Sequence, residues 1–134
     1  MRTSDKIVQR ITVLWFVVLV GLMYHIILHL TPVFYGINIT KPDADGATPP
    51  SMVLTYGLSF CIPVLAVVNV QYLRKSIAGL VNIVLAALAL LVNTAHLSEI
   101  ASTGIKQPEQ LFVLIPLFLV AVLLIIDSIK WLKK

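Results

Sequence analysis

Four long runs of apolar residues, separated by short polar segments, dominate the pattern along the chain. A helix rises 1.5 Å per residue, so about 20 apolar residues cross a hydrocarbon core of about 30 Å. Transmembrane β-strands would instead be about ten residues long with alternating polarity, which these runs do not show. The pattern therefore predicts four transmembrane helices, at about residues 7–31, 51–73, 77–98 and 109–132.

The composition agrees with an integral membrane protein. Hydrophobic residues make up 59% of the 134 residues and charged residues only 12%, against about 45–50% and about 25% in soluble domains. A soluble domain of this size leaves too much of its surface in water to hide so much apolar area. We therefore expect residues 1–134 to form a single transmembrane domain, an all-α polytopic membrane protein built as an antiparallel bundle of four transmembrane helices in a lipid bilayer.

The distribution of charge predicts how the helices are oriented. Eight of the ten Lys and Arg residues fall on one side: three before the first span, two between the second and third, and three at the C-terminus. Only Lys41 and Lys106 belong to the other side. Because short loops rich in Lys and Arg stay in the cytoplasm, we expect an N-in/C-in protein whose 32–50 loop lies outside. The net charge of +4 thus reflects orientation, and no nucleic acid is expected as a partner.

A few polar side chains lie inside the predicted spans. Asn69 and Asn82 have similar depths on the two sides of a very short Arg-Lys-Ser connection, so we expect their amides to face each other across a hairpin. Asp127 lies near the inner end of the fourth span with Lys130 three residues later, a spacing that predicts an ion pair. A proton-relay carboxylate is the alternative interpretation of Asp127.

The three histidines form the one constellation that points to chemistry. His25 and His29 are four residues apart and share a face of the first span. His96 closes the third span, which runs in the same direction, and Glu99 follows three residues later. All four side chains therefore reach the same outer leaflet, where ionisable groups usually face a bundle interior. Because Zn²⁺ takes imidazole and carboxylate ligands in a tetrahedral set, His25, His29, His96 and Glu99 are the candidate metal ligands.

Three alternatives to a metal site stay open at this point. The first is haem iron held between a histidine of the first span and His96, because these spans lie diagonally in an up-down bundle and leave room for a macrocycle. The same diagonal separation stretches a site for a single metal ion unless the helices converge. The second is that the histidines lie half wet at the membrane surface and bind no ligand. The third is a proton or ion pathway that uses the histidines.

Motifs for catalysis do not appear in the sequence. There is no H-E-x-x-H, no nucleophile elbow and no pair of neighbouring carboxylates, so no enzymatic reaction is predicted. The single cysteine, Cys61, lies inside the second span and excludes an intrachain disulfide.

The chain resembles small bacterial four-helix membrane proteins, DoxX-like in outline. The similarity lies in the short basic N-terminus, the QRITVLWF entry into the first span, the Arg-Lys hairpin and the closing IDSIKWLKK. The resemblance implies a four-helix bundle in a bacterial inner membrane and carries over no functional residue.

Three classes of function follow from these features. The first, which the sequence favours, is a structural or interaction subunit that meets another membrane protein or a second copy of itself. The second is a metal- or haem-binding protein that uses the outer-leaflet histidines. The third is a small transporter or channel, which would act as an oligomer because four helices with so few polar residues do not line a pore alone.

Overall fold

The structure is a computed structural model that describes residues 3–40, 45–102 and 108–133. Their regular elements are all helical: α1 (Thr3–Leu28), α2 (Thr31–Phe34), α3 (Pro50–Tyr72), α4 (Lys75–Ser102), the 3₁₀ helix η1 (Pro108–Gln110) and α5 (Leu111–Lys133). The four long helices, α1, α3, α4 and α5, are each long and apolar enough to cross a membrane. The predicted all-α architecture of four apolar helices is confirmed, and the chain is a small multi-span membrane protein.

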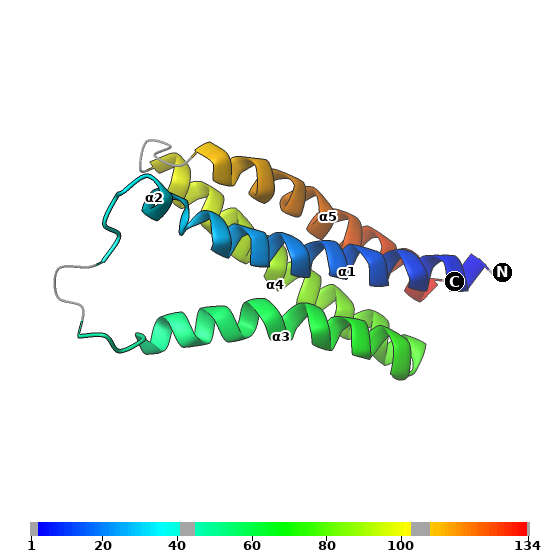
Figure 1. The fold of residues 1–134 in the computed structure, drawn as a ribbon. Coiled ribbons are helices and arrows are strands. Elements are labelled where there is room, and N and C mark those ends of the chain that lie inside the picture. The colour runs from blue at the N-terminus through cyan, green and yellow to red at the C-terminus, as the bar shows by residue number, and fades with distance from the viewer. Residues whose placement is uncertain (1–2, 41–44, 103–107, 134) are drawn as a thin grey trace.

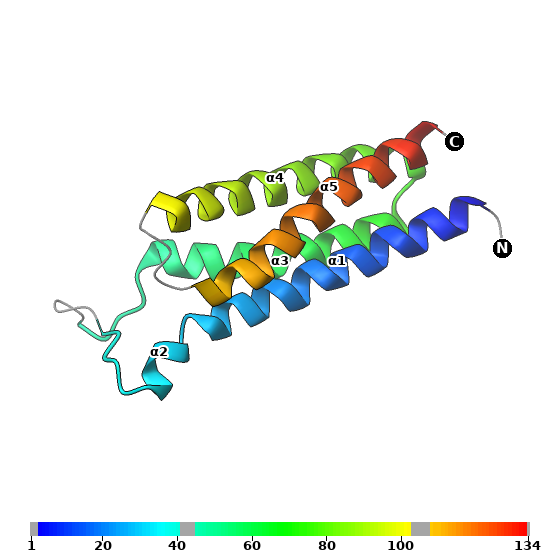
Figure 2. The same ribbon diagram turned by 90° about the horizontal axis from the view of Figure 1, so that it is seen from above.

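The four long helices lie alongside one another and alternate in direction (Figure 1 and Figure 2). Both termini and the short α3–α4 connection lie at one end of the bundle, and α2 lies at the other. Helix α1 packs against α3 and α5, and α4 packs against the same two helices. Helices α1 and α4 are therefore diagonal partners that run in the same direction.

Small residues allow α5 to pack closely against its neighbours. A Cβ added to Gly21 of α1 would lie 2.7 Å from the Leu117 side chain, and one added to Gly79 of α4 would lie 2.5 Å from that of Leu132. Helices in lipid gain stability from such close contact, since lipid tails are as apolar as the side chains. The buried apolar core lies between these contacts and includes Ile11, Trp15, Ala66, Ala86, Leu117 and Leu124.

The predicted pairing of Asn69 with Asn82 is wrong. Asn69 Nδ2 donates to the backbone oxygen of Ala78, at 2.9 Å, and so ties the end of α3 to the start of α4. Asn82 lies one turn further along α4 and faces the centre of the bundle, where it bonds Trp15 and Ser128 instead. The two amides have similar depths but different neighbours.

The predicted ion pair between Asp127 and Lys130 is also wrong. Arg10 Nη2 lies 2.8 Å from Oδ1 and 2.7 Å from Oδ2 of Asp127. The Asp127 side chain is only 1% exposed and faces α1, whereas Lys130 is exposed. Contact between helices has therefore overridden the local i,i+3 spacing.

Candidate metal centre

His25 lies in α1 and His29 directly beyond its end, whereas His96 lies in α4, the diagonal partner of α1; all three are at the end of the bundle near α2. Pro32 has no N–H to donate to the Leu28 carbonyl, so α1 ends at Leu28. His29 nevertheless stays one turn above His25, because its backbone N–H donates to the His25 carbonyl at 3.4 Å. His96 lies near the end of α4.

The imidazole rings converge although the two helices are diagonal partners. One ring nitrogen from each of His25, His29 and His96 lies within 4.8 Å of the other two. The ring centroids of His25 and His29 are 4.8 Å apart, and those of His25 and His96 are 4.9 Å apart. The structure thus shows that the two helices approach closely enough for their histidines to meet.

The spacing within the cluster suits a single small metal ion. Two imidazole nitrogens bound to tetrahedral Zn²⁺ at 2.0–2.1 Å are separated by about 3.3–3.4 Å. The Nε2 atoms of His25 and His29 are 3.3 Å apart. The His96 nitrogen lies within 4.8 Å of the other two, so the set has to contract by up to about 1.5 Å to bind one tetrahedral ion with all three rings.

In two of the rings, a neighbouring side chain contacts the Nδ1 nitrogen and leaves Nε2 for a metal ion. Glu99 Oε2 lies 3.3 Å from His96 Nδ1, and Gln110 Nε2 lies 3.3 Å from His29 Nδ1. Metal-bound histidines commonly bond a carboxylate or a carbonyl in this way, which fixes the tautomer and the ring orientation. Turning the Gln110 amide over would place its oxygen beside His29 Nδ1, where it would accept the ring N–H.

Two ring nitrogens of the cluster are buried without a hydrogen-bond partner. They are Nδ1 of His25 and Nε2 of His96, and His25 as a residue is only 9% exposed. An unpaired buried polar atom costs about 1–3 kcal/mol, and the described side chains offer no partner for His25 Nδ1. For His96 the unpaired atom is the nitrogen that does not face Glu99, and its lone pair is available to a metal ion.

The electrostatic environment favours neutral imidazole at His29, which lies beyond the end of the candidate span Asp5–Leu28. Burial lowers the pKa of His29 from its ordinary value of 6.5, the neighbouring His96 lowers it further, and Glu99 acts in the opposite direction. A neutral imidazole has a free lone pair and is the form that binds metals.

Of the four residues predicted from sequence, the structure brings the three histidines together. Glu99 lies against the outer side of the His96 ring, its side chain is 70% exposed, and it does not belong to the group of converging ligand atoms found among the described residues. Gln110 was missed by the sequence analysis, although it is only 1% exposed. Gln110 is a polar residue next to a loop, so no hydrophobic periodicity marks it as buried. Its place in the site becomes apparent only from the packing of η1 against α1.

Comparisons with known proteins do not identify a family. No family model matches the chain, and neither a curated protein nor a solved structure matches it. The similarity to DoxX-like proteins therefore stays at the level of a four-helix outline, and function is argued from the site alone.

Proposed function

We propose that this membrane protein binds one divalent first-row transition-metal ion through His25, His29 and His96. The observation that carries the proposal is the convergence of one nitrogen from each ring, all within 4.8 Å of one another. Imidazole ligands suit Zn²⁺, Cu²⁺ and Ni²⁺, whereas Mg²⁺ and Ca²⁺ prefer oxygen. Three protein ligands leave the fourth tetrahedral position to water or to an added ligand.

Glu99 takes a different role from the one expected of it. Its carboxylate lies beside His96 Nδ1, so it orients the ring and raises the basicity of the opposite nitrogen, as outer carboxylates do at zinc sites. Gln110 has the equivalent position beside His29. We therefore assign three ligands and two supporting residues in place of a four-ligand set.

A single ion fits this cluster better than haem. A macrocycle has to pass between its two axial ligands. Here the His25 ring packs edge-on against both His29 and His96, with centroids less than 5 Å away. Rings in mutual contact leave space between their nitrogens for one ion, but they leave no gap wide enough for the haem macrocycle.

We further propose that the site opens to the outside of a bacterial inner membrane. The support is the concentration of Lys and Arg at the other end of the bundle, where both termini lie. The ion would then come from the external side. Buried apolar residues, among them Val18, Ala86 and Ala121, separate the histidines from the polar groups at the opposite end of the bundle. A single chain therefore favours holding the ion over conducting it across the membrane.

A role as an interaction subunit is the second candidate. Residues 52–58, in the outer half of α3, are exposed on every side of the helix. This segment of an apolar span contains Thr55 and Tyr56, polar groups that another membrane helix would cover. Binding of metal and binding of a partner are compatible roles.

Equilibrium dialysis of the purified, metal-stripped protein against Zn²⁺ tests the proposed function. We expect one ion per chain, and loss of that ion in His25→Ala and in His96→Ala. Glu99→Gln should weaken binding about 10- to 100-fold, the usual effect of losing an outer carboxylate. Glu109→Gln, at the same end of the bundle but outside the cluster, is the matched control and should bind like the wild type. Binding that survives His96→Ala would contradict the proposal.

A further inference from the structure

Two grooves flank α1 near the end of the bundle that holds both termini. One has a volume of about 370 Å³ and is lined by Gln9, Arg10, Val13, Leu14 and Leu123, so it lies between α1 and α5. The other, of about 560 Å³, lies on the α3 side of α1, and its lining includes Asp5, Thr12, Phe16 and Gln71. Each groove has polar residues toward the end of the bundle and apolar residues further in.

The α1–α5 groove has a cation at its mouth. Arg10 contacts Asp127 only through Nη2, and its side chain is 60% exposed although it lies within the candidate span Asp5–Leu28. The rest of the guanidinium, a planar fork of N–H donors, therefore remains available at the groove. This geometry suits a phosphate, which Arg binds through two parallel hydrogen bonds.

The surrounding charge adds to the attraction. Lys6 lies one turn before Arg10 on α1, and Lys130 lies one turn after Asp127 on α5, so both are near the mouth. Both lysines are exposed. Lys6, Arg10 and Lys130 outnumber Asp5 and Asp127 by three to two, so these turns of α1 and α5 carry a net positive charge.

We infer that the α1–α5 groove is a binding site for an anionic phospholipid. The phosphate binds Arg10, and an acyl chain lies along Val13, Leu14 and Leu123 toward the membrane centre. The depth is suitable, because Arg10 is five residues beyond Asp5, about 7–8 Å along the helix. A side chain of this length reaches from there to the headgroup region.

The second groove provides an internal comparison. It is larger, but the charged residue in its lining is Asp5, and no Lys or Arg lines it. This lining therefore has no cation to bind an anionic headgroup. We therefore expect the α1–α5 groove to prefer anionic lipids and the groove on the α3 side of α1 to show no such preference.

Native mass spectrometry of the full chain in detergent tests the inference, with phosphatidylglycerol and phosphatidylcholine of identical acyl chains as the probes. We expect the wild type to retain one phosphatidylglycerol in preference to phosphatidylcholine. The double variant Arg10→Gln, Asp127→Asn removes both charges and keeps amide groups in place. It should lower the affinity for phosphatidylglycerol about tenfold, because the phosphate loses hydrogen bonds to a charged group while the net charge at the mouth stays the same. The affinity for phosphatidylcholine, whose choline is repelled by the guanidinium, should change less.

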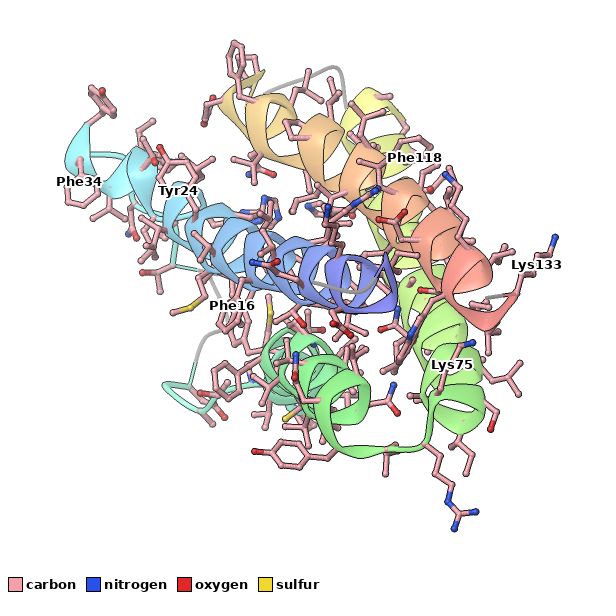
Figure 3. All side chains as sticks on the ribbon, turned by 90° about the vertical axis from the view of Figure 1, so that its right-hand side faces the viewer. Phe16, Tyr24, Phe34, Lys75, Phe118 and Lys133 are labelled. Atoms are coloured by element: carbon pink, nitrogen blue, oxygen red, sulfur yellow. The ribbon has the colours of Figure 1, made fainter. Side chains whose placement is uncertain are left out.

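Two further variants keep the test decisive. Lys133→Gln removes a charge at the same end of the bundle, where Lys133 is the last residue of α5 (Figure 3), and it should have no effect on the preference. Leu123→Trp fills the groove without changing charge and should reduce phosphatidylglycerol binding even if the double variant does not fold. Equal binding of both lipids to the wild type, or an equal loss in Lys133→Gln, would overturn the inference. Neither result depends on the metal site, which lies at the opposite end.

Discussion

Trp15 donates a hydrogen bond from its indole Nε1 to Oδ1 of Asn82, at 2.6 Å, and so joins α1 to α4 across the diagonal of the bundle. His29 follows Trp15 by fourteen residues, and His96 follows Asn82 by the same number. Fourteen residues are two heptads, a rise of about 21 Å in either helix. The Trp15–Asn82 bond therefore sets two parallel helices at the register that brings His29 level with His96.

The polar link at Asn82 should be coupled energetically to Trp15. In a double-mutant cycle of Asn82→Leu with Trp15→Phe, we expect a coupling of about 0.6–1.7 kcal/mol, the range for hydrogen bonds between membrane helices. The measurement is unfolding in mixed micelles. Asn82→Leu should also weaken Zn²⁺ binding, but less than His96→Ala does, because it loosens the register without removing a ligand.

Asn69 supplies the control for that cycle. It bonds the backbone of Ala78 and not Asn82, so Asn69→Leu and Asn82→Leu should be additive within about 0.5 kcal/mol. A coupling between Asn69 and Asn82 as large as that between Trp15 and Asn82 would show that the two amides face each other after all.

The ion pair between Arg10 and Asp127 should contribute to stability although Arg10 is partly exposed. Arg10→Ala leaves a carboxylate that is 1% exposed without its cation. Loss of one partner costs about 3–5 kcal/mol in fully buried pairs. We expect a smaller cost here, about 1–3 kcal/mol, because the exposed guanidinium reduces the desolvation. Lys130→Ala should change stability by less than about 0.5 kcal/mol, and an equal loss in the two variants would contradict the assigned pair.

Orientation in the membrane can be tested by cysteine accessibility. In a Cys61→Ser background, a membrane-impermeant maleimide applied to intact cells should label Ala47→Cys, which precedes α3, and spare Ser76→Cys, at the start of α4. The physical reason is the retention of Lys- and Arg-rich segments in the cytoplasm. Labelling of Ser76→Cys alone would reverse the proposed orientation and place the histidines inside.

Metal affinity should depend on pH because protons compete for the imidazole lone pairs. Because burial and the neighbouring His96 lower the pKa of His29, its competition with protons should begin below the ordinary imidazole value of about 6.5. From there Zn²⁺ affinity should fall about tenfold per pH unit for each ring that has to release a proton. Calorimetric titrations between pH 7.5 and 4.5 measure this slope. Affinity that stays constant down to pH 4.5 would contradict histidine ligands.

The helices were predictable because the information for them is local. About twenty consecutive apolar residues form a transmembrane helix whatever the rest of the chain does. A spacing of four residues likewise puts His25 and His29 on one face of a helix. That His29 and His96 reach the same depth also follows from the sequence, given that the first and third spans run in the same direction.

The contacts between helices were not predictable in the same way. Lys130 is the nearest base to Asp127 in sequence, but the rotation of α1 about its axis places Arg10 against the carboxylate. Asn82 points to the bundle centre and not to Asn69, and Gln110 reaches His29 from an element of three residues. Rotation and register of packed helices depend on the whole interface, and a single sequence does not contain them in readable form.

X-ray absorption spectroscopy of the Zn²⁺-loaded protein tests the central claim most directly. The three-histidine site predicts a first shell with three imidazole nitrogens at about 2.0–2.1 Å and one further light atom. In His96→Phe prepared in the same way, the bound zinc and this shell should be lost, because His25 and His29 alone do not retain the ion. A shell of oxygen atoms only, or an imidazole count that does not change in His96→Phe, would contradict a metal site shared between α1 and α4.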